Sequence, residues 1–339
     1  MAPTSPIQKS LFPAIDANYS GTLATSTHHN LYYEESGNPQ GLPVLCIHGG
    51  PGSASAPVHR RFFDPAIYRI CQLDQRGCGR SEPYGDTRQN TTADLIADME
   101  LLRAHLGIKS WLLFAGSWGA ALALLYAARH SDACTGLILR GSFMASRSDL
   151  QWFFETASAL RPEEWSAFTG CVGEQQQDDI LEAFHQQLRS EDSVMAKKAA
   201  AAWMFWENTL DNPVQRENNN APGSHNFPTA SERDVLKYQL QTEYLRHKCY
   251  VEEGAVATAA QQLGSLPVAL FHGRLDWVCR PKNAWQLHKM IDGSVLVWVE
   301  QSGHNPFSTA MSGALTTATA CFAKDGNFQQ LAREVSQIE

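Results

Sequence analysis

The feature that most restricts the fold is an alternation of short apolar runs with helical patterns. In the first part of the sequence, four runs have the length and composition of buried strands: 43–48, 68–74, 111–115 and 137–139. A helix is predicted between the second and third run, because apolar residues recur at helical spacing from Leu95 to Leu106, behind the N-cap candidates Thr91 and Thr92. This alternation predicts an α/β fold with a mostly parallel sheet and helices on both faces.

The same alternation returns near the end of the sequence but is missing from its middle. We predict strands at 267–271 and 295–299, a helix at 281–290 that opens on proline, and a closing helix near 313–322. Residues 142–263 are helical in pattern and lack strand-like alternation. We therefore predict one sheet domain in two parts, 1–141 and 264–339, with 142–263 as an inserted helical cap. Within the cap, 216–229 has breakers and no periodicity, so we expect a long flexible loop there.

Charge and composition exclude several classes of function. The chain has 339 residues, 43% of them hydrophobic, enough for a large buried core. Its net charge is −8 and no basic cluster exceeds two residues, so we expect no nucleic-acid partner. No stretch approaches the roughly 18 apolar residues that span a bilayer. Residues 1–12 contain neither the basic region nor the apolar region of a secretory signal peptide. We expect a cytoplasmic protein without a membrane partner.

The cysteines argue against a disulfide framework or a metal site. All eight stand singly, several of them inside apolar runs, with no C-x-x-C pair and no Cys/His cluster of zinc spacing. We interpret them as reduced thiols, mostly in the core.

Residues 115–119, Ala-Gly-Ser-Trp-Gly, lie between a predicted strand and a helix of small residues, 120–129. A strand-to-helix turn that exposes a nucleophilic serine needs small residues two before and two after it. Gly119 meets this requirement, and Ala115 adds only one methyl group to the glycine of the strict pattern. Ser117 is therefore a candidate nucleophile, although an ordinary strand-turn-helix connection has the same pattern.

Two further strand ends supply possible partners for Ser117. Asp276 follows the strand 267–271, and His304 follows the strand 295–299. The chain order Ser, Asp, His is that of α/β-hydrolases, and each residue lies at the carboxyl edge of the sheet, where ligands bind. Taken singly, Asp276 fits a turn residue and His304 a solvated one. Their joint placement predicts a catalytic triad, in which His304 is the base and Asp276 orients it.

Acyl transfer also needs two backbone N–H groups directed at the developing oxyanion. The residue after the nucleophile, Trp118, provides one of them. The second is expected from the loop after the strand 43–48, where the chain reads His48-Gly49-Gly50-Pro51-Gly52 and its glycines permit close approach to a substrate. The alternative is an ordinary Gly/Pro turn.

Together these segments resemble the prolyl aminopeptidases, also called proline iminopeptidases, of the α/β-hydrolase superfamily. The likeness covers nearly the whole chain, and it rests on 48–52, on 74–81 (Asp-Gln-Arg-Gly-Cys-Gly-Arg-Ser), on 116–119, on Leu139-Arg140-Gly141, on His272-Gly273-Arg274 with Asp276, and on Asn283-Ala284-Trp285 with Leu287-His288. The resemblance implies Ser117 as nucleophile with Asp276 and His304. It also implies Gly50 and Trp118 as oxyanion donors, a helical cap, and neither metal nor cofactor.

Members of this family release an N-terminal residue, preferably proline, and bind its charged amine with two cap glutamates. Residues 202–207 resemble the segment with the first glutamate, so Glu207 is the expected amine ligand, the alternative being a surface charge on a cap helix. Gln241 stands in the place of the second glutamate, and Glu243 cannot replace it because residues two apart on a helix do not share a face. Since Gln241 offers a carbonyl but no charge, we predict a less strict preference for proline.

Three further residues are expected near the site. Phe143 and Phe153 take positions of the family's aromatic pocket wall, although both also fit a core of cap aromatics. Cys279, three residues after Asp276, is interpreted as a structural thiol near the triad. We expect its modification to slow the enzyme by bulk.

The sequence thus predicts a serine exopeptidase acting on short peptides or aminoacyl amides with a free N-terminal amine, and releasing proline or another small residue. An amidase or esterase acting on amino-acid amides or esters would share the triad and differ in the pocket. A non-catalytic binding protein on the same scaffold is the third alternative, yet no triad residue is missing.

Overall fold

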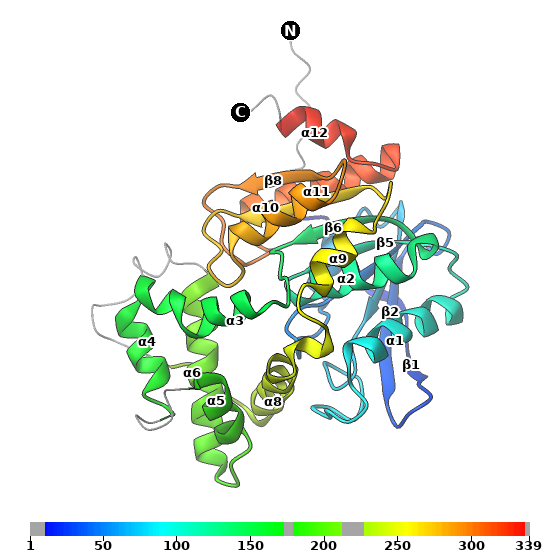
Figure 1. Ribbon diagram of the computed structural model, residues 1–339. Helices are drawn as coiled ribbons and strands as arrows, with labels where there is room; N and C mark the ends of the chain where they lie inside the picture. Colours follow the sequence, from blue (N-terminus) through cyan, green and yellow to red (C-terminus); the bar gives the residue numbers. More distant parts are fainter. Residues whose placement is uncertain (1–10, 173–178, 212–226, 336–339) are drawn as a thin grey trace.

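An eight-stranded sheet forms the centre of the computed structural model, which describes residues 11–172, 179–211 and 227–335 (Figure 1). The strands lie in the order β1-β2-β4-β3-β5-β6-β7-β8. β1, β2 and β4 pair antiparallel, and β4, β3, β5, β6, β7 and β8 pair parallel. Their bounds are Ala17–Ala24, Asn30–Gly37, Leu42–Ile47, Tyr68–Leu73, Trp111–Gly116, Cys134–Arg140, Val268–Gly273 and Val295–Val299, from β1 to β8. The predicted mostly parallel sheet is confirmed.

β1 and β2 are the strands that the sequence analysis missed. They form an antiparallel pair at one edge of the sheet, and most of β1 is exposed. β2 buries Leu31 and Tyr33 but carries polar residues through its second half. Such edge strands lack the continuous apolar run that marks a buried parallel strand.

Helices cover both faces of the sheet because alternate strand residues point to opposite sides. In β3, Leu45 and Ile47 face one apolar cluster, and Val44 and Cys46 face the other. The first cluster is covered by α1 (Thr92–His105), α2 (Trp118–Arg129), α9 (Ala255–Gln261) and α10 (Pro281–Met290), and the second by α11 (Thr309–Asp325) and α12 (Gln329–Val335). Thr91 is the N-cap of α1, since its side chain accepts the N–H of Asp94.

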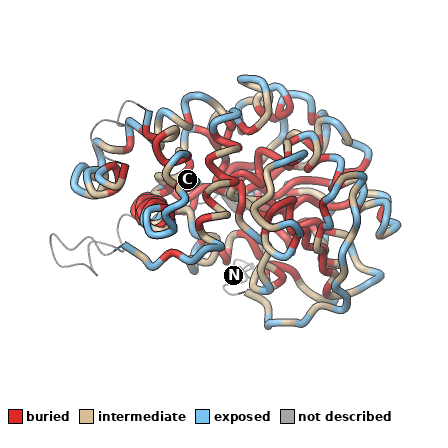
Figure 2. The backbone as a smooth tube through the Cα atoms, turned by 90° about the horizontal axis from the view of Figure 1, so that it is seen from below, coloured by how far each residue is buried: buried red, intermediate tan, exposed pale blue. Residues whose placement is uncertain are grey.

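Between β6 and β7 the chain leaves the sheet and forms a group of helices to one side of it, at lower left in Figure 1. They are α3 (Arg147–Phe154), α4 (Pro162–Thr169), α5 (Ile180–Leu188), α6 (Ser193–Asp211) and α8 (Glu232–Arg246). Aromatic rings fill their interior: Phe168 stacks on Phe184 with ring centroids 4.4 Å apart, and Trp203 and Trp206 are fully buried. In Figure 2 buried backbone runs through the sheet and continues into this group.

We retain 1–141, 142–263 and 264–339 as our proposed division, with the qualification that α9 packs against α2 and α10 of the core. Most of the predicted loop 216–229 lies outside the described residues, and 227–229 have no regular structure.

Among the described helices, none is long and apolar enough to cross a membrane. All eight cysteines are free and seven are buried, so most of them are core residues, as predicted.

Candidate active site

Ser117 occupies the sharp turn between β5 and α2. Its backbone has φ 59° and ψ −128°, a conformation that non-glycine residues rarely adopt. The turn brings α2 so close to β3 that a Cβ on Gly119 would lie 2.5 Å from the carbonyl oxygen of Ile47, so only glycine fits there. Ala115 is buried and is compatible with the turn. The fold thus presents Ser117 at the carboxyl end of β5.

Asp276 and His304 lie on the loops after β7 and β8, and their side chains are hydrogen-bonded. His304 Nδ1 is 2.7 Å from Asp276 Oδ2, and the Cys279 N–H donates to Asp276 Oδ1 at 2.9 Å. Burial alone would raise the pKa of the Asp276 carboxyl, but His304, His272 and these hydrogen bonds outweigh burial and lower the pKa. Asp276 is therefore an ionised acceptor, which requires His304 Nδ1 to carry a proton.

Ser117 and His304 line the same cavity, yet within the described ranges no hydrogen bond joins their side chains. The polar neighbour of Ser117 Oγ is Cys279 Sγ, at 4.0 Å. Catalytic hydrogen bonds are often long without substrate and tighten when it binds. The structure thus brings two of the three expected triad residues into contact and places the third beside them.

The two expected oxyanion donors lie near Ser117, since Trp118 follows it in the chain and Gly50 lines the same cavity. Trp118 is the first residue of α2, so its N–H has no partner within the helix and lies at the positive end of the helix dipole. Gly50 belongs to the loop after β3, with φ 116°. The preceding Gly49 is so close to Ser117 that a Cβ on it would lie 3.1 Å from Ser117 Cβ. This geometry suits our assignment of Gly50 and Trp118.

Buried polar groups hold the loop of Gly50 in place. Asp74 accepts the N–H of Ser55 at 2.9 Å and also the N–H of Arg80 at 2.9 Å. Burial would raise the pKa of Asp74. The nearby His48 and the hydrogen bonds that Asp74 accepts from Ser55 and Arg80 outweigh burial and lower this pKa. The N–H of Gln75 donates to His48 Nε2 at 3.0 Å. The loop after β4 therefore braces the loop after β3.

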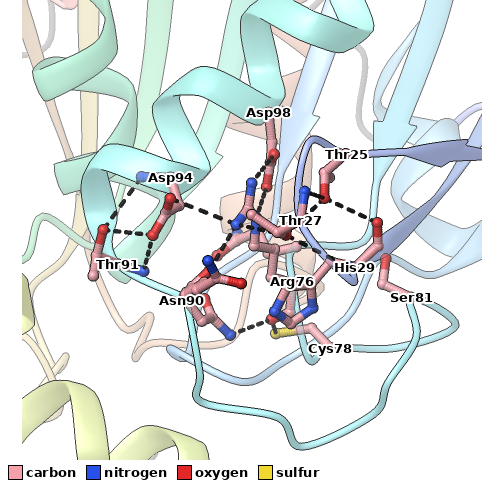
Figure 3. Close-up of polar contacts among 12 residues, drawn as sticks. Thr25, Thr27, His29, Arg76, Cys78, Ser81, Asn90, Thr91, Asp94 and Asp98 are labelled. Atoms are coloured by element: carbon pink, nitrogen blue, oxygen red, sulfur yellow. Dashed lines mark hydrogen bonds and ion pairs between the residues drawn. The ribbon is translucent and has the colours of Figure 1, made fainter.

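The loop after β4 is in turn fixed by Arg76, which lies at the centre of the network in Figure 3. Its guanidinium donates twice to Asp98 of α1, at 2.6 and 2.7 Å, and once to the carbonyl of Gln89 at 2.6 Å. Asn90 donates to the Arg76 carbonyl at 3.0 Å and accepts from the hydroxyl of the cap residue Tyr244 at 2.8 Å. This network links the core loop to the cap.

Glu207 lies on α6 and lines the cavity, as expected for an amine ligand. Three donors converge on its carboxylate: Trp203 Nε1 at 3.1 Å, Gln241 Nε2 at 2.8 Å and the Tyr238 hydroxyl at 3.0 Å. Burial and the charge of Glu207 raise the pKa of Tyr238 well above its ordinary value, so Tyr238 remains a donor. Glu207 is thus a held and oriented carboxylate rather than a free surface charge.

Gln241 and Glu243 of α8 face different surroundings. Gln241 is 7% exposed and lines the cavity, and its Oε1 is buried without a hydrogen-bond partner. Glu243 instead pairs with Arg189 at 3.2 Å, and it is not among the cavity residues. The structure agrees with the argument that residues two apart on a helix do not share a face.

The cavity has a volume of about 430 Å³ and lies between cap and core. Phe143 and Phe153 both line it. Phe153 also packs against Phe154 and Trp203, with ring centroids 4.9 and 5.9 Å apart, so it belongs to the cap core as well as to the cavity wall. Both interpretations of Phe153 therefore apply.

Sequence reasoning missed several polar residues of the cavity. Asp211, Tyr238 and Lys237 are within or directly beside its wall, and none was a candidate. Helical spacing from the predicted residues could have identified two of them. Asp211 follows Glu207 by four residues and Tyr238 precedes Gln241 by three, and such pairs lie on one face of a helix.

The end of α6 contacts both loops that carry the expected partners of Ser117. The carbonyl of Leu210 accepts the N–H of Trp277 at 3.2 Å, and the carbonyl of Asp211 accepts the N–H of His304 at 3.1 Å. The last carbonyls of a helix have no partner within it, so the two loops satisfy them. The helix that carries Glu207 is thereby tied to the triad loops.

One further group has the composition of a metal site. His28, His29 and Asp86 offer ligand atoms within 4.8 Å of one another. Arg88, however, binds both carboxylate oxygens of Asp86, at 2.5 to 3.2 Å, and the positive charge of Arg76 lies close to His29. Because these cations oppose a metal ion, we assign none.

Comparison with known proteins places this geometry in a class. The profile of the alpha/beta hydrolase fold family matches residues 43–310. Similar solved structures include a proline iminopeptidase-related protein from Thermus thermophilus, with 20% identity, a TM-score of 0.55 and coverage of 90% of this chain and 97% of that one. An esterase from Rhodococcus sp. has 20% identity and a TM-score of 0.56, over 94% of this chain and 98% of that one. At such identities these structures show the fold alone, and the fold is that of an α/β hydrolase.

Curated relatives give the family within that class. A proline iminopeptidase from Xylella fastidiosa (strain 9a5c) is 39% identical over 93% of this chain and 99% of its own length. One from Arabidopsis thaliana is 36% identical over 92% of this chain and 81% of its own, and one from Neisseria gonorrhoeae is 37% identical over 88% and 94%. The chain belongs to the proline iminopeptidase family, as the sequence resemblance indicated.

Proposed function

We propose that this chain is a serine exopeptidase that releases an N-terminal proline, or another small residue, from peptides with a free N-terminal amine. The observation that carries the proposal is that a single cavity holds Ser117 and His304 together with Glu207 and the unpartnered oxygen of Gln241. A nucleophile and an amine-binding carboxylate in one cavity suit cleavage next to the N-terminus. The names of the relatives support this activity.

In the proposed reaction Ser117 Oγ attacks the carbonyl carbon of the N-terminal residue, and His304 takes the hydroxyl proton. Asp276 stabilises the imidazolium through the 2.7 Å hydrogen bond to Nδ1. The N–H groups of Gly50 and Trp118 stabilise the oxyanion. The peptide C–N bond then breaks as His304 returns the proton to the leaving amine. A water molecule repeats the sequence on the acyl-enzyme and releases the free amino acid.

The substrate amine supplies the missing hydrogen-bond donor for Gln241 Oε1. The secondary ammonium of an N-terminal proline has two N–H groups, of which one pairs with the Glu207 carboxylate and the other with Gln241 Oε1. A charge-assisted hydrogen bond of this kind contributes roughly 1.5 to 3 kcal/mol. Phe143 and Phe153 supply an apolar wall for the pyrrolidine ring. Because Gln241 adds no charge, other small N-terminal residues are expected substrates too.

A panel of aminoacyl-arylamides tests the proposal: Pro, Ala, Gly and Leu, each with and without an N-acetyl group, beside a plain acetyl ester. A preference for proline that disappears on acetylation is the expected result. Turnover of the blocked substrates or of the ester, without preference for proline, would instead identify an amidase or esterase and remove Glu207 from the site. Failure of a fluorophosphonate to label Ser117 would favour a non-catalytic binding protein.

We further propose that the protein works in the cytoplasm. Eight free cysteines, seven of them buried, suit a reducing compartment. Cell fractionation of a native host tests this, and recovery of the protein outside the cytosolic fraction would contradict it.

A further inference from the structure

Asp211 is a carboxylate of the cavity that the proposed reaction leaves unused. It is the last residue of α6 and lines the cavity, and its Oδ1 is buried without a hydrogen-bond partner. A buried acceptor without a donor is costly, and a carboxylate oxygen more so than a neutral one. Two cavity residues carry such an acceptor, Gln241 Oε1 and Asp211 Oδ1, and the proposed contact with the substrate amine uses only the first.

The position of Asp211 relative to Glu207 follows from the helix. The two residues are four apart on α6, so they share a face and are separated by about 6 Å along the axis. An extended peptide advances about 3.3 to 3.6 Å per residue, so this separation corresponds to roughly two residues of substrate. If Glu207 holds the amine, Asp211 lies level with the part of the peptide just beyond the N-terminal residue.

The neighbours of Asp211 indicate on which side of the scissile bond it lies. Its carbonyl accepts the N–H of His304 at 3.1 Å. Burial raises the pKa of its carboxyl and the nearby Asp276 adds to that rise, while the charges of His304 and Arg140 and the N–H of Asn305 oppose it. His304 is the group that protonates the leaving amine in the proposed reaction. Asp211 therefore lies on the leaving-group side of the scissile bond.

The nearby cations leave Asp211 available. Arg140 donates to the carbonyl of His304 at 2.5 Å, and within the described ranges it forms no ion pair with Asp211. Lys237 also lines the cavity, but it lies on α8 beside Gly52, and its ammonium is 3.4 Å from the Tyr238 hydroxyl. A cation supplied by the substrate is the missing partner.

We propose that Asp211 forms an anionic subsite for the second residue of the peptide, and that the enzyme prefers substrates whose second residue carries a cationic side chain, lysine or arginine. The inference rests on the proposed function, since it takes the orientation of the peptide from amine binding at Glu207. It adds a selectivity determinant on the leaving-group side.

Three matched dipeptide amides test the proposal: Pro-Lys-amide, Pro-(acetyl-lysine)-amide and Pro-Glu-amide. Their C-terminal amides remove the terminal carboxylate, and acetylation removes the lysine charge while keeping the chain. We expect the wild type to show a kcat/KM about tenfold higher for Pro-Lys-amide than for the acetyl-lysine amide, the size of one charge-assisted hydrogen bond. Asp211→Asn should abolish this difference, so that the lysine and acetyl-lysine amides are cleaved with the same kcat/KM.

Glu243→Gln is the matched control, because it removes an equal charge from the cap outside the cavity and should keep the tenfold ratio. Equal loss on every substrate in Asp211→Asn would mean that Asp211 only positions His304, and would overturn the subsite. Equal turnover of the lysine and acetyl-lysine amides by the wild type would overturn it too. Proline arylamide separates the two proposals: if the wild type fails to cleave it, the proposed function fails. If it is cleaved without a lysine preference, the subsite alone fails.

Discussion

The side-chain amide of Gln241 donates a hydrogen bond to Glu207 Oε1 at 2.8 Å, although the family resemblance places a second acid at position 241. Its other end, Oε1, is buried and unpartnered. A second carboxylate in the same place would repel Glu207 and lose the N–H donor. The neutral residue therefore orients the first amine ligand and supplies an acceptor beside it.

Glu207→Gln should separate amine binding from acyl transfer. We expect kcat/KM for proline arylamide to fall about 10- to 100-fold, because the charged partner of the substrate ammonium is lost. Turnover of a plain acetyl ester, measured in the same preparation, should not change. Glu243→Gln serves as the control, since it removes a carboxylate that pairs with Arg189 away from the cavity. An equal loss on the ester would show that Glu207 supports the fold of the site instead.

Ser117→Ala should abolish acyl transfer and labelling by a fluorophosphonate. The loss is expected to exceed about 1,000-fold in kcat/KM, because removal of the nucleophile leaves only oxyanion stabilisation and binding. An unchanged melting temperature would establish that the variant folds. Peptidase activity above a few per cent of wild type would contradict the mechanism.

Gly50→Ala should lower kcat/KM about 100-fold, the cost of one lost oxyanion donor. At φ 116° a Cβ would lie 2.5 Å from the N of Gly52 and 2.7 Å from the N of Ser53, so the loop must shift. Gly107→Ala is the matched control: φ is also positive, at 63°, but no atom lies within 4 Å of the added Cβ. We expect Gly107→Ala to lose some stability and no activity. Equal kinetic losses in both variants would argue against Gly50 as a donor.

Thiol reagents should slow the enzyme through Cys279, because the added group takes up space beside the triad. Its Sγ lies 4.0 Å from Ser117 Oγ, and the thiol is 3% exposed. Burial, with the charge of Asp276, raises the pKa of this thiol well above its ordinary value, so the reaction should be slow. Cys279→Ser should retain activity and become insensitive, whereas Cys171→Ser, at the partly exposed cysteine, should remain sensitive. An inactive Cys279→Ser of unchanged fold would refute this role.

His59 should make the protein less stable in mild acid. Burial, with smaller contributions from His48 and Arg140, lowers the pKa of His59 to about 4 from 6.5. Below pH 6.5 the unfolded chain binds a proton that the folded chain does not, so the free energy of unfolding falls as pH drops toward 4. One such group costs about 2 kcal/mol by pH 5. Urea unfolding at several pH values between 7 and 5 measures this fall in the free energy of unfolding.

In His59→Gln that part of the pH dependence should disappear, while His247→Gln, at an exposed histidine, should keep it. Identical pH profiles for wild type and His59→Gln would rule His59 out as the source.

The parallel strands and the order of Ser117, Asp276 and His304 were predictable because the buried strands are mainly apolar and end at polar loops. The edge strands β1 and β2 were not, since most of β1 is exposed and the buried residues of β2 include the polar Glu34 and Ser36. Gln241 and Glu207 were found through resemblance. Their hydrogen bond, and the convergence of Tyr238 and Trp203 on Glu207, depend on how α6 and α8 pack, which no local pattern encodes.

The carbonyls at the end of α6 accept the N–H groups of Trp277 and His304, and this limits how the protein can be engineered. A cap exchanged as a whole would remove two acceptors on which the loops of Asp276 and His304 rest. Chimeras should therefore keep 203–211 with the core and exchange only α3, α4 and α5. The structural boundary between cap and core therefore lies within α6, and not at the end of β6, where the chain leaves the sheet.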